Sequence, residues 1–113
     1  MTAPPPALLA YHSSGSSLNC ELVVLASPCI FWPIAELTAL NQKYQVHELA
    51  PRFFGFASDG SGEMLAITPD GGAVTMPFVG MNPADAFEIA ETWDEFLKYL
   101  ASDDGVDGLG RMV

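Results

Sequence analysis

Two glycine-rich segments, Asp59-Gly60-Ser61-Gly62-Glu63 and Pro69-Asp70-Gly71-Gly72, interrupt the most apolar part of the chain. They separate three apolar runs, which are Arg52 to Ala57, Glu63 to Thr68 and Ala73 to Val79. Asp-Gly and Gly-Gly between such runs are typical of hairpins, because glycine adopts a positive φ at little steric cost. The pattern therefore predicts an antiparallel meander of three strands, with Pro77 at an edge or a strand end.

The residues before the meander predict a strand and a helix. Leu18 to Ala26 is a nearly continuous apolar run with two valines, typical of a buried strand, and Ser27-Pro28 would end it. A short extended piece, Cys29 to Trp32, follows. Pro33 suits the first position of a helix that runs to about Tyr44, since apolar residues then recur every three or four positions.

The residues after the meander contain two helix starts. Asn82-Pro83 would cap one, with Asp85 in its first turn. Thr92-Trp93-Asp94-Glu95 reads as a capping box, in which the Thr and Glu side chains satisfy the first backbone amides. An apolar stripe then recurs at helical spacing, formed by Trp93, Phe96, Leu97 and Leu100. Phe87 to Ala90 fits either an extended segment or a short helical turn.

These elements predict one domain in which helices precede and follow an antiparallel meander, in a chain of 113 residues. We expect residues 1–17 to form a Pro/Ser-rich leader with a short helix, residues 18–101 the domain, and residues 102–113 a flexible acidic tail. The longest apolar run, Leu22 to Ala26, is far below the roughly 20 residues that span a bilayer. No basic residue precedes the N-terminal apolar patch. We therefore expect a cytoplasmic protein without a membrane partner.

The chain is strongly acidic. Fourteen Asp and Glu residues against four Lys and Arg residues give a net charge of −10, which disfavours a nucleic-acid partner. Eight of the acids fall in the last 29 residues: Asp85, Glu88, Glu91, Asp94, Glu95, Asp103, Asp104 and Asp107. This pattern fits either a solvated acidic surface or a surface that docks a basic protein.

The glycine-rich segments do not fit a phosphate site. Gly60-Ser61-Gly62 is followed by Glu63 and a predicted strand, without the lysine or the helix N-terminus that would hold the anion. Asp59, Ser61 and Glu63 alternate as calcium ligands do, but the glycine and the distant glutamate of an EF-hand are absent. We expect plain turns here.

Catalytic and metal-binding patterns are also missing. Cys20 and Cys29 are nine positions apart, which matches no zinc or redox spacing, and we expect both to be buried. His12 and His47 have no companions at ligand spacing, and no nucleophile signature is present. We therefore expect no enzymatic activity, no cofactor and no metal.

The order of features resembles the SUKH superfamily, in particular its SMI/KNR-type domains, which include regulators of cell wall assembly. Asp59, Gly60, Gly62 and Glu63 match the family's hairpin, and Phe96-Leu97 matches the pair in its closing helix. The segments that carry the resemblance are FWPIAELTALNQKY (Phe31 to Tyr44), FFGFASDGSGEMLAI (Phe53 to Ile67), GGAVTMPF (Gly71 to Phe78) and IAETWDEFLKYL (Ile89 to Leu100). The asparagine near the end of the first segment is also part of the family's pattern.

The resemblance implies an α+β domain with a mainly antiparallel sheet and flanking helices, which acts as a non-enzymatic module that binds proteins. Most bacterial members of the family are immunity proteins that neutralise a cognate toxin, and others are regulatory interaction modules. A basic toxin domain would be the partner here, and the predicted partner-binding residues are Asp59, Glu63, Glu91, Asp94 and Glu95.

The segment before the first strand is shorter than in the family, which is expected to leave part of the sheet uncovered. A homodimer or the toxin would then cover it, unless the chain is a degenerate copy without function. Two alternatives stand beside the immunity function: a small-ligand or metal-binding domain, and a regulatory or structural homodimer.

Overall fold

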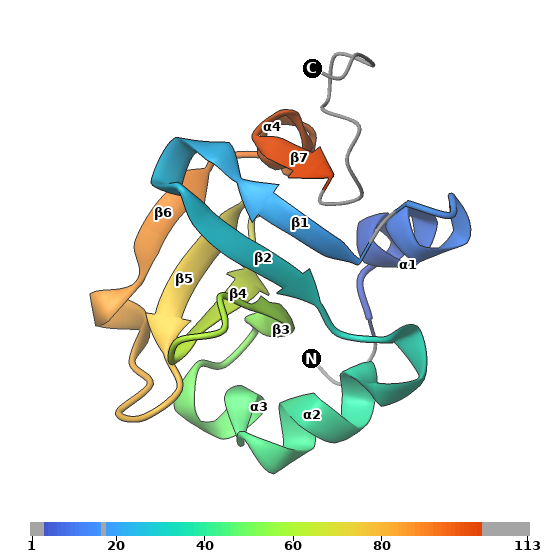
Figure 1. Ribbon diagram of the computed structural model, residues 1–113. Helices are drawn as coiled ribbons and strands as arrows, with labels where there is room; N and C mark the ends of the chain where they lie inside the picture. The colour runs from blue at the N-terminus through green and yellow to red at the C-terminus, as the bar shows by residue number, and fades with distance from the viewer. Residues whose placement is uncertain (1–3, 17, 103–113) are drawn as a thin grey trace.

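The computed structural model, which describes residues 4–16 and 18–102, has an α+β fold built on one curled antiparallel sheet (Figure 1). The order of strands across the sheet is β6-β5-β4-β3-β2-β1-β7. The strands are β1 (Asn19–Leu22), β2 (Ser27–Phe31), β3 (Phe54–Ser58), β4 (Glu63–Ile67), β5 (Ala73–Pro77), β6 (Phe87–Ala90) and β7 (Leu100–Ser102). The helices are α1 (Pro6–Ser13), α2 (Leu37–Lys43), α3 (Val46–Leu49) and α4 (Trp93–Lys98), and the 3₁₀ turns are η1 (Val23–Leu25), η2 (Ile34–Glu36) and η3 (Pro83–Asp85). The predicted fold class is confirmed.

The predicted meander is present as β3, β4 and β5. Each neighbouring pair is antiparallel, and β4 pairs with β5 from Glu63 opposite Pro77 to Ile67 opposite Ala73. Gly60 and Gly71 have φ values of 82° and 94°, which shows that the turns need the left-handed backbone that glycine accepts. Pro77 ends its strand, as predicted, where a missing N–H costs the least.

The predicted strand from Leu18 to Ala26 is wrong in its second half. β1 ends at Leu22, which lies opposite Ser27 at the start of β2, so the chain must reverse between these two residues. The reversal is η1 followed by Ala26 in the left-handed region, with a φ of 52°. Val23 and Val24 are 58% and 54% exposed. An apolar run without periodicity could not reveal where the strand ends and the turn begins.

The predicted helices also differ in their lengths. The segment after Pro33 begins as the 3₁₀ turn η2 and becomes an α-helix only at Leu37. α4 ends at Lys98, and Leu100 belongs to β7, where it pairs with Leu22. Phe87–Ala90, for which two conformations were open, is the edge strand β6. The predicted tail, apart from Ser102 in β7, lies outside the described residues. None of the described helices is both long enough and apolar enough to cross a membrane.

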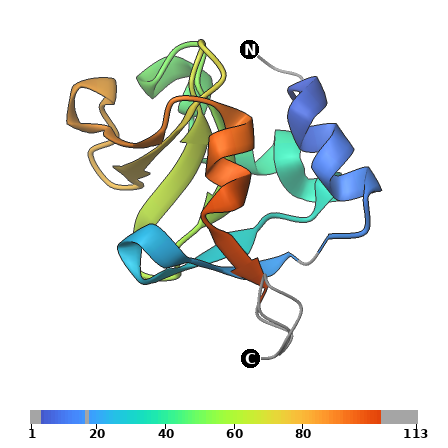
Figure 2. The ribbon, with the colours of Figure 1, turned by 90° about the horizontal axis from the view of Figure 1, so that it is seen from above.

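One face of the sheet is covered by α1 and α4, which lie side by side over it (Figure 2). Tyr11 of α1 stacks on Phe31 of β2, with ring centroids 4.3 Å apart. Trp93 and Phe96 of α4 contact Phe56 of β3 at 5.2 and 5.5 Å between ring centroids. Leu8 of α1 is fully buried in the same core. The N-terminal helix is therefore packed on the domain.

The opposite face of the sheet is covered by α2 and α3. Consecutive strand residues point to opposite faces, so Trp32 and Gly55 face away from Phe31 and Phe56. Trp32 stacks against Tyr44 and Phe78, with ring centroids 6.0 and 6.3 Å away. Because both faces are covered, almost every residue of β3 and β4 is buried.

The side chain of Asn41 connects α2 to strand β3 of the sheet. Its amide nitrogen donates to the carbonyls of Leu37 and Gly55, at 2.8 and 2.9 Å, and its amide oxygen accepts from the N–H of Gly55 at 2.8 Å. Gly55 lies where the register of β3 against β4 shifts. A Cβ at Gly55 would lie 2.6 Å from Sδ of Met64, so a larger residue here would force the buried Met64 side chain to move. The side chain of Asn41 thus makes the hydrogen bonds to the Gly55 backbone that a neighbouring strand would otherwise make.

Replacement of Asn41 tests this role. Asn41→Ala leaves both backbone groups of Gly55 buried without a partner, and we expect the free energy of unfolding to fall by about 2–4 kcal/mol. Urea denaturation measures the loss, with Gln42→Ala, at the next and exposed position, as a control expected to change stability by less than about 0.5 kcal/mol. A loss for Asn41→Ala no larger than that of the control would contradict the role of the amide.

Candidate functional site

The structure divides the five predicted partner-binding residues into two groups. Asp59 and Glu63 lie in the turn between β3 and β4, next to the Pro77 end of β5. Glu91, Asp94 and Glu95 follow β6, whose last residue lies opposite Ala73 at the other end of β5. Pro77 and Ala73 are four residues apart along β5, so the two groups are separated by roughly 13 Å. They form two acidic surfaces and not a single one.

In the first group, Asp59 is occupied in shaping its own turn. Its Oδ1 accepts hydrogen bonds from the N–H groups of Ser61 and Glu63, at 2.8 and 3.1 Å. The hydroxyl of Ser58 accepts from the N–H of Gly60 at 2.9 Å. These side chains replace backbone acceptors in a turn too tight to supply them. The carboxylate of Asp59 is therefore primarily structural.

The pKa values of the two carboxyl groups in this turn move apart. Burial by itself would raise the pKa of Asp59, but the backbone hydrogen bonds from Ser61 and Glu63 outweigh burial and lower it. Partial burial raises the pKa of Glu63, and the negative charge of Asp59 adds to that increase. Glu63 is consequently the member of the pair that gains more from a basic group brought by a partner.

An exposed apolar side chain borders this turn. Ile30 of β2 pairs with Ser58, and a Cβ on Gly60 would lie 3.5 Å from Cδ1 of Ile30. Ile30 is 39% exposed. Glu63 and Ile30 thus place an acid and an apolar group beside the same turn.

In the second group, Glu95 is occupied in capping α4. The hydroxyl of Thr92 accepts from the N–H of Glu95 at 3.1 Å, as predicted for a capping box. Oε1 of Glu95 accepts from the N–H of Glu91, one residue before the cap, at 2.8 Å. Its Oε2 accepts from the hydroxyl of Tyr99 at 3.0 Å, and this hydrogen bond raises the pKa of Tyr99. Glu91 and Asp94 keep exposed carboxylates.

Glu91 belongs to an acidic hollow of about 470 Å³ between the second glycine turn and the edge strand β6. Three acidic residues, Asp70, Glu88 and Glu91, line it together with the aromatic residue Phe53. No lysine or arginine occurs among the described residues that line it. We refer to this feature, lined also by Thr68, Gly72, Val74 and Ala90, as the acidic hollow.

Gly72 fixes the shape of the acidic hollow. A Cβ at Gly72 would lie 2.5 Å from the carbonyl oxygen of Ala90 and 2.9 Å from that of Glu91, so the end of β6 approaches this closely only over glycine. Thr68 closes the turn, because its hydroxyl accepts from the N–H of Gly72 at 3.0 Å and its N–H donates to the carbonyl of Gly72. The turn holds Asp70 on the same hollow as Glu88 and Glu91.

Sequence reasoning missed the acidic hollow. The sequence pattern places Asp70 only in a turn, and Glu88 only among the acids of the C-terminal part of the chain. The signal present in the sequence was an acid in the second glycine turn combined with acids at both ends of a short apolar strand. The register that joins them, with Ala73 opposite Ala90 and Val74 opposite Glu88, contains a shift that sequence spacing does not reveal.

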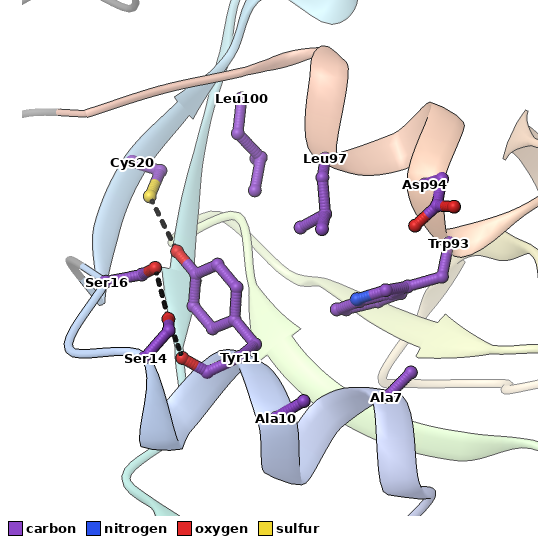
Figure 3. Close-up of a pocket in the computed structure, with 10 residues that line it drawn as sticks. All are labelled: Ala7, Ala10, Tyr11, Ser14, Ser16, Cys20, Trp93, Asp94, Leu97 and Leu100. Carbon is purple, nitrogen blue, oxygen red and sulfur yellow. Dashed lines mark hydrogen bonds between the residues drawn. The ribbon is translucent and has the colours of Figure 1, made fainter.

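A second hollow is a groove between α1 and α4, with a volume of about 680 Å³ (Figure 3). Tyr11 and Trp93 form its two aromatic walls, and Leu97 and Leu100 add aliphatic surface from the α4 side. Asp94 lies beside Trp93 at its rim. Of the predicted residues, only Asp94 lines this groove.

The candidate metal ligands and the two cysteines were the remaining groups with possible chemistry. Residues 4–16 and 18–102 contain no group of three or more His, Cys, Asp or Glu side chains that could hold a metal ion. Cys20 and Cys29 are buried opposite each other on β1 and β2. Burial raises the pKa of the Cys29 thiol well above its usual range, and the charge of Cys20 adds to the increase. Such a thiol is a poor nucleophile at neutral pH.

The Asp59 turn gives a pH-dependent prediction. The lowered pKa means that ionised Asp59 stabilises the fold above its unfolded-state pKa, and that this contribution disappears as the pH falls through the lower folded-state pKa. Asp59→Ala is expected to cost about 1 kcal/mol at pH 7. The difference from the parent chain is expected to shrink below about pH 4. Urea denaturation across this pH range measures it.

Asp59→Asn is the matched control for this prediction, because its side-chain oxygen still accepts the two hydrogen bonds while the charge is gone. We expect this variant to lose less stability at pH 7 than Asp59→Ala. A gap between Asp59→Ala and the parent chain that stays constant from pH 7 to pH 3 would show that the ionised carboxylate does not support the turn.

The chain was also compared with other proteins. No protein-family model matches it, and no match was found among curated proteins or solved structures. The resemblance to SMI/KNR-type domains thus rests on the ordered segments quoted above, and membership of that family stays a prediction.

Proposed function

We propose that this chain is a non-enzymatic protein-binding module of the immunity type, which neutralises a bacterial toxin by docking on it. The observation that carries the proposal is the acidic hollow. Three carboxylates from a turn and an edge strand lie around one concave surface without a lysine or arginine among its described residues. Three negative charges on one concave surface attract a cationic group of a partner.

The chemistry of the acidic hollow favours a basic side chain of a partner, above all arginine. A planar guanidinium binds carboxylates through two parallel hydrogen bonds and also stacks on aromatic rings. Asp70, Glu88 and Glu91 supply the carboxylates, and Phe53 supplies the ring. Arginine seated in a concave, partly desolvated site is a frequent hot spot of protein interfaces.

The surroundings of the acidic hollow suit an interface. β6 is an edge strand, so its outer backbone groups have no strand partner within the described sheet. Phe87 on this strand is 57% exposed and offers apolar surface beside Glu88. Burial of an exposed aromatic ring contributes to the affinity for a protein partner, and the neighbouring charges select which partner binds.

The resemblance to SMI/KNR-type domains supports the toxin as the partner. Three of the four segments that carry it include the β3–β4 turn, β5 and α4, which border the two acidic surfaces, and the fourth runs from the end of β2 through α2. In this proposal the toxin is a basic domain, and the mechanism is steric and electrostatic occlusion without chemistry. The acidic turn at Glu63, next to Ile30, is available as a second contact.

A homodimer is the second candidate, favoured by the exposed apolar turn η1. Val23, Val24 and Leu25 form the tight reversal between β1 and β2. These three apolar residues are 58%, 54% and 37% exposed. Such a patch is a common element of self-association surfaces. It lies at the β1–β2 reversal. In the order of strands, β3, β4 and β5 stand between β2 and the edge strand β6.

Coexpression with the product of the neighbouring toxin gene tests the proposal. We expect the chain to restore growth and to bind the purified toxin domain. The double variant Asp70→Asn/Glu88→Gln is expected to slow association at least about fivefold at low salt, with a smaller effect at 0.5 M salt. Stopped-flow or biosensor kinetics measure both rates.

Glu48→Gln, an exposed acid on α3, is the matched control and is expected to leave association nearly unchanged. Absence of binding to the neighbouring product would overturn the toxin assignment. Binding that is equally fast in the double variant and the control would instead remove the acidic hollow from the interface.

A further inference from the structure

The groove between α1 and α4 has the dimensions of a small-molecule site. Its volume of about 680 Å³ falls within the roughly 300–1,000 Å³ typical of ligand pockets. Ala7 and Ala10 line it from α1 with the smallest side chains that a helix commonly carries, which leaves the space between the helices open. Larger side chains at these two positions would fill the groove.

The aromatic walls of the groove are held in place from behind. Tyr11 stacks on Phe31, and its hydroxyl forms a hydrogen bond with the Cys20 thiol at 3.5 Å. Trp93 contacts both Phe56 and Phe96, with centroid distances of 5.2 and 5.1 Å. Because the rings are already fixed, a ligand placed between them would cost little side-chain entropy.

The charge of the groove selects the class of ligand. Asp94 is exposed at the rim beside the indole of Trp93, as Figure 3 shows. No lysine, arginine or histidine is among the described lining residues, and the chain carries a net charge of −10. A carboxylate next to an indole ring attracts an ammonium group through both ion pairing and cation–π interaction. An anionic head group placed at Asp94 would meet electrostatic repulsion there.

We propose that the α1–α4 groove binds a small amphiphilic cation, with an aromatic or aliphatic body between Tyr11 and Trp93 and an ammonium group at Asp94. The serine hydroxyls of Ser14 and Ser16 and the Tyr11–Cys20 pair form the polar end of the groove. The inference is independent of toxin docking, because the acidic hollow and this groove have different lining residues.

Two probes of similar shape and opposite charge test the proposal on the full chain. We expect 2-naphthylmethylammonium to bind with a Kd below about 1 mM, and 2-naphthylacetate to bind at least about tenfold more weakly. Asp94→Asn is expected to bring the two affinities within about twofold of each other. Nuclear magnetic resonance titration follows the indole N–H of Trp93, with the buried Trp32 as the internal reference.

Two further variants separate the groove from general effects. Ala10→Leu, at an exposed helix position, is expected to weaken binding of both probes at least about tenfold while the melting temperature stays within about 2 °C. Glu48→Gln removes one negative charge far from the groove and should keep the discrimination between the probes.

Several results would overturn the proposal. Equal affinity for the two probes, or discrimination that survives Asp94→Asn, would show that Asp94 does not select the cation. Binding unaffected by Ala10→Leu would place the probe elsewhere. Sedimentation that reveals a dimer dissociated by Ala10→Leu would assign the groove to a second copy of the chain.

Discussion

The fold depends on one buried amide, the side chain of Asn41. A residue larger than glycine at position 55 would force the buried Met64 side chain to move. The register against β4 shifts between Gly55 and Ala57, and the pairing of β3 with β2 covers only Ala57 and Ser58, so the backbone of Gly55 lies beyond that pairing. Asn41 supplies both a donor and an acceptor to it, and in doing so ties α2 to the middle of the sheet. Polar groups buried this deeply are tolerated only when every hydrogen bond is made.

The covering of both sheet faces decides which surfaces remain for binding. Aromatic contacts fix α1 and α4 on one face, and Trp32, Tyr44 and Phe78 close the other below α2. Open surface is left at the edge strand β6, at the reversals between strands, and between α1 and α4. The acidic hollow and the groove occur at two of these places.

The acidic residues divide into those that build the fold and those that are available to a partner. Asp59 accepts two backbone hydrogen bonds in its turn, and Glu95 holds the start of α4. Asp70, Glu88, Glu91 and Asp94 instead line open concave surfaces. The net charge does not distinguish these two groups, because a carboxylate contributes one negative charge whether it caps a helix or lines a concave surface. The proposed docking and ligand binding would therefore involve a minority of the fourteen acids.

The sequence by itself determined the local structure wherever the cause is local. Glycines in the two turns, the capping residues Thr92 and Glu95, and Pro77 at a strand end act within a few residues of themselves, so the meander and the start of α4 were predictable. Tertiary structure decided the rest. The end of β1 at Leu22 is set by its pairing with β2 and β7, and the acidic hollow exists because Gly72 lets β6 approach the second turn. Such contacts join residues far apart in the chain, and no spacing within one segment encodes them.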